Sequence, residues 1–376
     1  MGGAEHWLLD AIASLSPAEN RRLNPVILGG QCPAYQNRLP DGLPRYDFAL
    51  PAVKGSAISK IRALIHLLWT AKKLKSTLKK HQATQVFTNT PRAHLTVLLL
   101  KLVWGWPGRW IMMVHDFTTR PTWLVARLGA TADIVIANAL PTRQWLRQAF
   151  NEKDHGKIRL IENGILPAET IKPTQHLETV VNLGRLDPRK GQQYFVEAAD
   201  LLQERNPDVR FSVVGDSVAP DLPTVAYEQT IKQFAADRKL QNLTFKPGVE
   251  APLATIDQHD ALVFTPTEPE TFGRVVIEAL SRGKLVIAFA QTGPKEILEH
   301  YHRWLTKKFP EEAAFTTGEN WLLVEPNNAM SLAERLAYFA DNPDVTALHT
   351  KAAAQFVAEN YNLAETKKRW LEVLGL

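Results

Sequence analysis

Cysteine is almost absent from this sequence: Cys32 is the single cysteine among 376 residues. One thiol excludes an intrachain disulfide and a metal site built from several cysteines, and it favours a reducing compartment. Long apolar runs are missing as well. The most apolar window, residues 95–106, contains Lys101 and is far shorter than the roughly 20 residues that span a membrane, so it predicts a buried helix.

The start of the sequence lacks a basic region followed by an apolar one, which would indicate a signal peptide. With the low cysteine content, this predicts a cytoplasmic protein. No internal repeat or low-complexity segment is present either. What the sequence does contain, 45% hydrophobic and 22% charged residues, is typical of globular domains with a substantial core. The length predicts two such domains.

Charge is distributed unevenly along the chain. Residues 1–170 contain 22 Lys and Arg against 11 Asp and Glu, whereas the remainder contains 22 against 28. The net charge of +5 therefore combines a basic first half with an acidic second half. This asymmetry suggests that the first domain meets an anionic surface or acceptor.

Residues 59–81 concentrate this basic character. The segment predicts an amphipathic helix, with an apolar stripe at Ile61, Leu64, Ile65, Leu68 and Trp69 and seven lysines and arginines elsewhere. The basic residues are explained either by a solvated helix face or by contact with anionic lipid headgroups. A nucleic-acid partner is not expected, because no recognised nucleic-acid-binding motif accompanies the charges.

Residues 261–289 predict a βαβ unit. Residues 261–264 and 285–289 are short apolar runs typical of buried strands, and residues 274–281 have helical spacing. The loop at 265–273 lies between the first strand and the helix, at the carboxyl edge of a parallel sheet, where ligands bind.

Two acids stand out in this unit. Glu270 lies in the loop, and Glu278 lies about 6 Å along the helix from its start, given a rise of about 1.5 Å per residue. Free N–H groups at the helix start suit a phosphate, which would leave Glu278 near a ribose and Glu270 near the group that the phosphate carries. The alternative is that Glu270 is a solvated acid favourable to the helix dipole.

The segment 270–278, Glu-Thr-Phe-Gly-Arg-Val-Val-Ile-Glu, resembles the signature of retaining GT-B glycosyltransferases of family 4, in which seven residues separate two glutamates. The resemblance implies an α/β fold of two Rossmann-like, doubly wound domains facing across a cleft. It also implies that Glu270 orients the donor sugar and that Glu278 binds the ribose. Phe272, Gly273 and Arg274 would line the donor site.

The same resemblance implies a first, acceptor-side domain at residues 1–168 and a second, nucleotide-sugar-binding domain at 169–376. The last helix of such enzymes commonly crosses back to the first domain, and we expect the same here.

A second candidate phosphate site is the loop at 184–191, Gly-Arg-Leu-Asp-Pro-Arg-Lys-Gly. Three basic residues at a strand-to-helix turn suit a diphosphate, although an ordinary polar loop has the same composition. The loop resembles the family pattern Gly-Arg-Leu-x-x-x-Lys-Gly, which implies that Arg185 and Lys190 hold the donor diphosphate. Residues 243–248 resemble the strand and turn beside the nucleotide base, which makes Lys246 a neighbour of the nucleotide.

His115 follows the predicted strand 109–114, so it faces a ligand crevice at the sheet edge or has a structural role. The family resemblance implies a functional histidine here. Gly3 lies in a glycine turn whose backbone N–H groups can approach a phosphate. The turn resembles a family Gly-Gly-x-Glu motif, which implies that Gly3 helps to bind the donor, although a β-strand normally precedes the glycines in the family. We therefore expect either that the natural start lies about a dozen residues upstream, or that the protein is a compromised relative.

The combined prediction is a retaining glycosyltransferase of the hexosyltransferase type. It would move a sugar from a UDP-sugar or GDP-sugar to a glycolipid or saccharide hydroxyl, in lipopolysaccharide or other bacterial surface polysaccharide assembly. Neither a cofactor nor a metal is expected, since the sequence lacks the Asp-x-Asp pattern that holds a metal on a diphosphate. The predicted location is the cytoplasm or the inner face of the membrane.

Two alternatives stay open at this point. One is a nucleotide-sugar epimerase or hydrolase on the same fold, and the other is a non-catalytic nucleotide-sugar binder.

Overall fold

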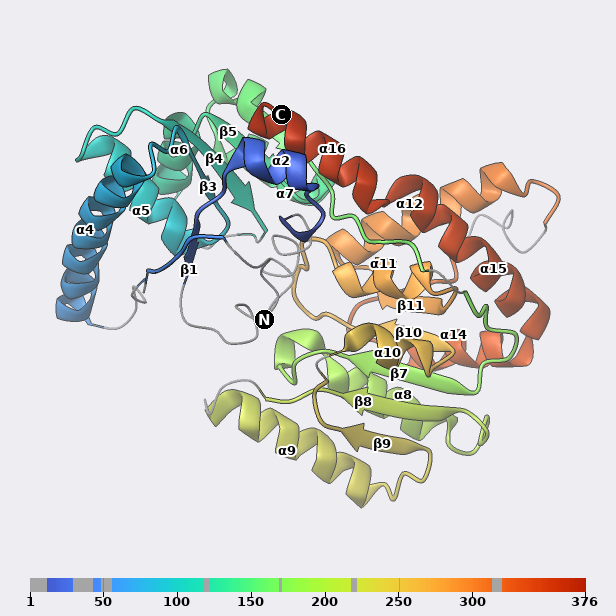
Figure 1. Cartoon of the computed structure of the whole chain (residues 1–376). Helices are drawn as coiled ribbons and strands as arrows, with labels where there is room; N and C mark the ends of the chain where they lie inside the picture. The colour runs from blue at the N-terminus through green and yellow to red at the C-terminus, as the bar shows by residue number, and fades with distance from the viewer. Residues whose placement is uncertain are drawn as a thin grey trace. The chain divides into compact units, whose positions relative to one another are not determined.

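The computed structural model describes residues 12–29, 43–48, 50, 56–115, 117, 122–168, 171–217, 222–249, 251–312 and 320–376. The chain forms two compact units, one of Met1–Asn163 with Ala364–Leu376 and one of Gly164–Leu363 (Figure 1). Each unit contains a parallel sheet with helices between its strands, which confirms the predicted α/β class of two Rossmann-like domains. The units divide between Asn163 and Gly164.

The first unit has a four-stranded parallel sheet in the order β3-β4-β5-β6. Its strands are β3 (Gln85–Thr88), β4 (Arg109–Val114), β5 (Ile134–Ala137) and β6 (Ile158–Leu160). Its helices are α2 (Pro17–Leu23), α4 (Ala57–Lys80), α5 (Pro91–Leu102), α6 (Thr122–Thr131), α7 (Leu140–Ala149), the 3-10 helix η1 (Glu152–Lys157) and α16 (Leu363–Leu374).

Two further strands of this unit, β1 (Ile27–Gly29) and β2 (Arg45–Asp47), pair in parallel in a separate sheet. Within the ranges that the structure describes, no strand joins this pair to β3. Gly3 and its expected glycine turn lie outside those ranges.

Side chains of β4 alternate between the two faces of the first sheet, as the pleat requires. Trp110 and Met112 are buried in a core with residues of α4, α5, α6 and α7. Ile111 and Met113 are buried on the opposite face against Trp370 of α16. The last helix thus supplies one of the two layers that cover this sheet.

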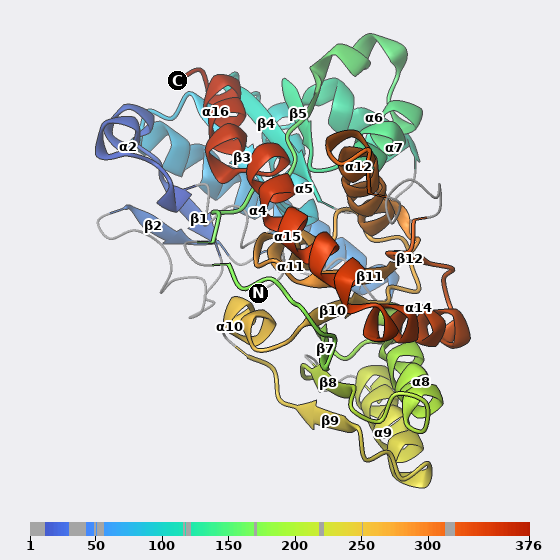
Figure 2. The same cartoon turned by 90° about the vertical axis from the view of Figure 1, so that its right-hand side faces the viewer.

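The second unit has six parallel strands in the order β12-β11-β10-β7-β8-β9. They are β7 (Thr179–Leu183), β8 (Arg210–Val214), β9 (Leu243–Lys246), β10 (Ala261–Phe264), β11 (Leu285–Phe289) and β12 (Leu323–Val324). The helices are η2 (Pro188–Lys190), α8 (Gln192–Leu202), α9 (Leu222–Asp237), α10 (Pro252–Asp257), α11 (Arg274–Ser281), α12 (Thr292–Lys308), α14 (Ala329–Asp341) and α15 (Pro343–Asn360). Helices α8, α9 and α14 pack together (Figure 2). Helix α11 contacts α10, α12 and α15, and these four helices form a second group.

The order of the second sheet places β7 beside β10 at its centre. From β7 the chain proceeds outward to β8 and β9, and from β10 it proceeds in the opposite direction to β11 and β12. The loops that follow β7 and β10 therefore diverge at a topological switch point, where open α/β sheets bind ligands. Both loops were singled out by the sequence.

Three segments differ from what their sequences predict, which is a turn at 291–296, a surface insertion at 301–315 and a helix at 347–374. The expected turn at 291–296 is largely the first turn of α12, which tolerates Pro294 because the first N–H groups of a helix need no intrahelical partner. A surface insertion expected at 301–315 is wrong for 301–308, since Tyr301 and Leu305 are buried. The expected helix at 347–374 is interrupted after α15, where Asn362 forms an isolated parallel bridge with Ile165.

Candidate functional site

The loop after β7 turns sharply at Gly191, which joins η2 to α8. Gly191 has φ 63°, and a Cβ atom there would lie 2.1 Å from the backbone oxygen of Thr265. A side chain at this position would meet both a strained backbone and a collision. The glycine therefore allows the loops after β7 and β10 to approach within contact distance.

Hydrogen bonds then join these two loops. The Thr265 hydroxyl donates to the backbone oxygen of Lys190 at 3.0 Å, and the Thr267 N–H donates to the backbone oxygen of Arg189 at 3.0 Å. Asn182, buried on β7, donates its amide to the Thr265 hydroxyl at 3.1 Å. Because these partners lie in or beside both loops, the two loops hold a defined relative position.

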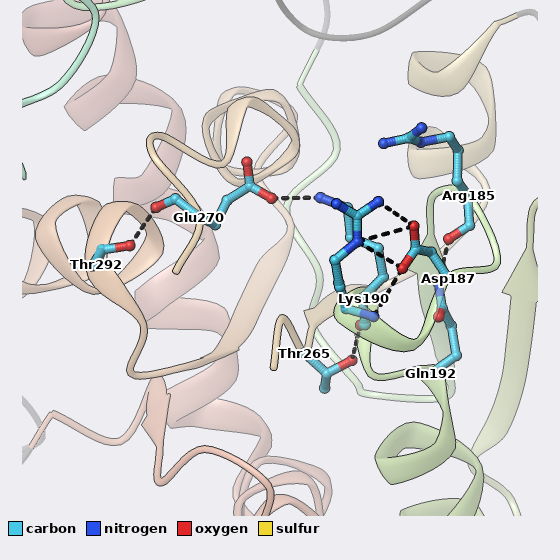
Figure 3. A network of polar contacts seen from close by, with 8 residues as sticks. Arg185, Asp187, Lys190, Gln192, Thr265, Glu270 and Thr292 are labelled. Carbon is cyan, nitrogen blue, oxygen red and sulfur yellow. Dashed lines mark hydrogen bonds and ion pairs between the residues drawn. The ribbon is translucent and has the colours of Figure 1, made fainter. Parts of the chain in front are cut away.

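Lys190 and Glu270 form an ion pair between the ends of these loops (Figure 3). Each side chain is 26% exposed, so both charges remain accessible to a ligand. The Lys190 ammonium also lies 5.5 Å from the ring centroid of Phe264, within range of a cation–π contact. Two residues predicted to bind the donor are thus in direct contact, although 80 positions separate them in the chain.

The other two basic residues of the loop differ in their surroundings. Arg189 pairs with Asp187 at 2.6 Å, and its guanidinium lowers the pKa of that carboxyl. Arg185 is anchored only through its backbone, whose oxygen accepts from the Gln192 amide at 2.8 Å. Its exposed guanidinium has no ion pair with any residue that the structure describes, and Figure 3 shows it pointing away from Asp187. An incoming anion can therefore engage Arg185 without displacing a carboxylate.

The start of α11 is the third part of the site. Gly273 caps the helix with φ 81°, and the N–H groups of the first turn lie at the end of the loop after β10. Arg274 donates to the Glu278 carboxylate at 2.8 Å, and both side chains are mostly buried. Glu278 therefore lies about one turn from the helix start, as its spacing predicted. Its carboxylate is already ion-paired with the Arg274 guanidinium.

Phe272, predicted to line the donor site, directs its side chain away from solvent. Its side chain is buried and lies edge-on to Tyr361, with the ring centroids 6.0 Å apart. The ring therefore belongs to the core of the second unit, and only the backbone of Phe272 is placed to line a donor site. The sequence Thr-Phe-Gly at 271–273 gives no signal of whether the ring or the backbone of Phe272 faces the ligand.

The start of α12 supports the Glu270 loop, which the sequence did not predict. The N–H of Gly293 donates to the backbone oxygen of Glu270 at 2.8 Å, and the Thr292 hydroxyl donates to the same oxygen. A Cβ at Gly293 would lie 2.5 Å from the backbone oxygen of Thr271. The Thr-Gly-Pro sequence at 292–294 was the available signal, because glycine marks a close backbone approach.

Lys246 ends β9, the edge strand on the far side of β8 from β7. Its backbone oxygen accepts from the N–H of Gly215 at 3.1 Å, and its side chain is exposed. The structure shows no bond between Lys246 and the Lys190–Glu270 pair among the residues it describes. Its role beside the nucleotide stays a prediction.

His115 lies in the first unit, directly after β4. Its Nε2 is hydrogen-bonded to Oδ1 of Asn89, which follows the neighbouring strand β3. Since an amide oxygen only accepts, Nε2 carries the proton in this contact. Burial lowers the pKa of His115 to about 4, so the ring is neutral at pH 7. The strand-end position was predictable, whereas Asn89 was not identified as its partner.

The second unit therefore combines an accessible cation, an ion-paired cation, a helix entrance and two carboxylates around one switch point. Cations and a helix start together favour binding of a multiply charged anion such as a diphosphate. Among the residues that the structure describes, no cluster of His, Cys, Asp and Glu is arranged to hold a metal ion. In the same ranges no helix is long and apolar enough to span a membrane.

Comparison with known proteins identifies two families along the chain. The family model of glycosyl transferases group 1 matches residues 169–360, and the model of glycosyltransferase family 4 matches residues 1–169. A D-inositol 3-phosphate glycosyltransferase of Corynebacterium glutamicum is 28% identical over 171 residues, which cover 45% of this chain and 36% of the relative. A poly(ribitol-phosphate) alpha-N-acetylglucosaminyltransferase of Staphylococcus aureus is 21% identical over 227 residues, covering 60% and 41%.

The matched parts thus span less than half of these two relatives. Among solved structures, Anabaena HepE in complex with UDP and glucose superposes with a TM-score of 0.78 and 20% identity, covering 100% of this chain and 96% of that one. At this identity the likeness shows the fold, a GT-B arrangement of two Rossmann-like domains. With a family model that matches half of its residues and a second that matches most of the rest, the chain belongs to the group 1 glycosyl transferases, preceded by a family 4 glycosyltransferase domain.

Proposed function

We propose that the protein is a retaining glycosyltransferase that moves a sugar from a nucleotide diphosphate donor to an acceptor hydroxyl. The observation that carries the proposal is the contact of Lys190 with Glu270 at the switch point of the second unit. It places a cation suited to the diphosphate beside an acid suited to the sugar. Family membership supports the same reaction type, and retention of configuration is inferred from the resemblance of residues 270–278.

In this proposal the diphosphate binds Arg185, Lys190 and the N–H groups at the start of α11. As the bond between sugar and phosphate breaks, negative charge grows on the leaving diphosphate, and the two cations stabilise it. This stabilisation of the leaving group by Arg185 and Lys190 does not require a protein side chain to act as a nucleophile. Such preorganised charge accelerates the reaction because the leaving diphosphate is more negative in the transition state than in the bound donor, so the cations bind the transition state more strongly.

The two glutamates have separate roles. Glu270 orients the donor sugar and stabilises positive charge near the anomeric carbon. Glu278 accepts hydrogen bonds from the ribose hydroxyls. Since Arg274 already donates to one carboxylate oxygen of Glu278, it fixes the direction in which the carboxylate points. In the first unit, His115 with its Nε2 proton, together with Gly3, would contribute to binding of the sugar and acceptor.

The Lys190–Glu270 ion pair has a consequence for donor binding. With no ligand present, each group neutralises the other, so the donor must insert a phosphate oxygen beside Lys190 and a sugar hydroxyl beside Glu270. Both side chains are partly solvated, which keeps this rearrangement inexpensive. The pair thus holds both side chains near their binding positions before the donor arrives.

For the acceptor we propose a glycolipid or lipid-linked saccharide of bacterial surface polysaccharide assembly. The basic residues of α4 and the excess of Lys and Arg over Asp and Glu in residues 1–170 support this choice. In this proposal the protein works at the anionic inner surface of the membrane. The named relatives act on phosphate-containing acceptors, D-inositol 3-phosphate and poly(ribitol-phosphate), which is compatible with a basic acceptor domain.

A thermal-shift panel of UDP-sugars and GDP-sugars tests the donor. A ligand at about 100 times its dissociation constant stabilises the folded state by roughly 2.7 kcal/mol, so a matching donor should raise Tm clearly. Product analysis then separates the alternatives. Donor consumed without acceptor, yielding an epimer or free sugar, would identify an epimerase or hydrolase. Donor binding without turnover on any acceptor would favour a non-catalytic binder.

A further inference from the structure

An apolar pocket lies among α4, α5 and α6 of the first unit. Its cavity volume is about 560 Å³, within the range of small-molecule sites. It is lined by Leu64, Leu67, Leu95, Leu98, Leu99, Leu102, Trp123, Leu124 and Arg127. Eight of these nine side chains are apolar, so the pocket suits a hydrocarbon and offers almost nothing to a sugar or a nucleotide.

The rim of the pocket is open to solvent. Leu64, Leu102 and Trp123 are 50%, 47% and 70% exposed. The buried face of α4 consists of other residues, among them Ala63, Leu67, Ala71 and Leu74. The leucines and the tryptophan at the rim therefore are not held in place as part of the core.

The apolar surface continues from the pocket along α4. Ile58, Ile61, Ile65 and Trp69 are all more than half exposed. The stripe read from the sequence thus faces outward instead of packing against the sheet. Exposed apolar patches of this kind on a single protein mark binding surfaces for proteins, membranes or ligands.

Charge distinguishes among these partners. Helix α4 contains seven Lys and Arg, α5 two and α6 one, and none of the three contains Asp or Glu. No acidic residue occurs anywhere between Asp47 and Asp116. Arg127 brings a positive charge to the lining of the pocket itself. An apolar cavity beside a purely basic surface matches an amphiphile with a hydrocarbon chain and an anionic headgroup.

We propose that this pocket binds the hydrocarbon chain of a lipid phosphate, with Arg127 and the basic residues of α4 meeting its headgroup. This assignment makes the acceptor a lipid-linked molecule. That the bound lipid serves as acceptor rests on the proposed function. Binding of the chain does not depend on that function. The pocket belongs to the first unit, whereas Lys190 and Glu270 belong to the second, so chain binding and donor binding can be measured separately.

Titration of the full-length protein with hexyl, octyl and decyl phosphate, each below its micelle-forming concentration, tests the pocket. If the chain is buried, affinity should rise about fourfold per added methylene until the pocket is filled. Inorganic phosphate should bind far more weakly than octyl phosphate. Octyl glucoside, with the same chain and no charge, should bind several-fold more weakly than octyl phosphate, and R127Q should reduce that difference.

The variant L64Q/L102Q/W123Q changes only rim residues with exposed side chains and should therefore fold. We expect it to lose at least tenfold in octyl phosphate affinity while its thermal shift with a nucleotide sugar is unchanged. A matched control, L201Q/M330Q, replaces exposed apolar residues of the second unit, 42% and 55% exposed, and should bind octyl phosphate like the unmodified chain.

Three results would overturn the proposal. One is affinity that does not depend on chain length, and another is equal loss of binding in the rim and control variants. The third is that the unmodified protein forms a dimer and binds no alkyl phosphate, whereas the variant L64Q/L102Q/W123Q is a monomer. A second copy of the chain would then occupy the pocket. Absence of any nucleotide-sugar shift, with octyl phosphate binding intact, would instead contradict the proposed function alone.

Discussion

The Lys190 ammonium contacts the Glu270 carboxylate where the loops after β7 and β10 meet, and this contact joins the two halves of the candidate donor site. The loops are held in register by backbone and hydroxyl hydrogen bonds from Thr265 and Thr267. Because these hydrogen bonds position the loops independently of the ion pair, Lys190 and Glu270 can be substituted without loss of the fold.

Replacement of Lys190 by alanine should reduce kcat about 100- to 1,000-fold, the range seen when one preorganised group that stabilises developing negative charge is removed. The substitution should change Tm little, since the ion pair is partly solvated. Steady-state kinetics with the donor identified by thermal shift measures the effect. K295Q, on the exposed surface of α12, is the matched control and should keep full activity.

Replacement of Glu278 by glutamine should weaken donor binding by about 10-fold or more, because a hydrogen bond to a charged acceptor contributes roughly 1.5–3 kcal/mol. The specific test is a comparison of a ribonucleotide sugar with its 2′-deoxy and 3′-deoxy analogues. The unmodified protein should prefer the ribose form, and E278Q should lose that preference. Equal discrimination by both proteins would assign ribose recognition to another residue.

Replacement of Gly191 by alanine should destabilise the second unit, because the new Cβ would lie 2.1 Å from the Thr265 oxygen on a backbone with φ 63°. Strain of this kind costs about 1–3 kcal/mol before the collision is added, so Tm should fall by several degrees. Gly156 is the control, since a Cβ there has no neighbour within 4 Å. Calorimetry of both variants distinguishes the destabilisation caused by strain and collision at Gly191 from the effect that any replacement of glycine by alanine has on stability.

The neutral state of His115 predicts a pH dependence. Its folded pKa, about 4, lies below the ordinary value of 6.5, so between these values the unfolded chain binds a proton that the folded chain does not. Folding stability should therefore fall as the pH decreases from about 6.5 to about 4. His349, with a pKa of about 3, contributes in the same direction. Urea unfolding of H115Q should show a shallower pH dependence than that of the unmodified chain.

Activity provides a second readout of His115. If the neutral ring donates through Nε2, the group should not titrate between pH 6 and 8, and kcat should not change in that range on its account. H115A should lower activity at every pH in the range. A rate that follows a single ionisation near pH 6.5, and that H115A abolishes, would show instead that the ring becomes protonated in the working enzyme.

Local sequence predicted the element order of the candidate site well. The bounds of β10, α11 and β11 agree with the predicted ones at every residue, because buried strands and a short amphipathic helix carry strong periodic signals. The loops after β7 and β10 were also identified. Helices α6, α9 and α10 were not predicted, and of the surface insertion expected at 301–315 the part 301–308 proved to be helix with buried side chains at Tyr301 and Leu305.

By itself the sequence determined a two-domain parallel α/β protein, its family resemblance and the residues that bear charge at the sheet edges. Tertiary structure decided the rest. It paired Lys190 with Glu270, turned the ring of Phe272 into the core and left the apolar stripe of α4 exposed. The physical reason is that periodicity reports which face of an element is apolar, whereas packing between elements distant in the chain decides what covers that face.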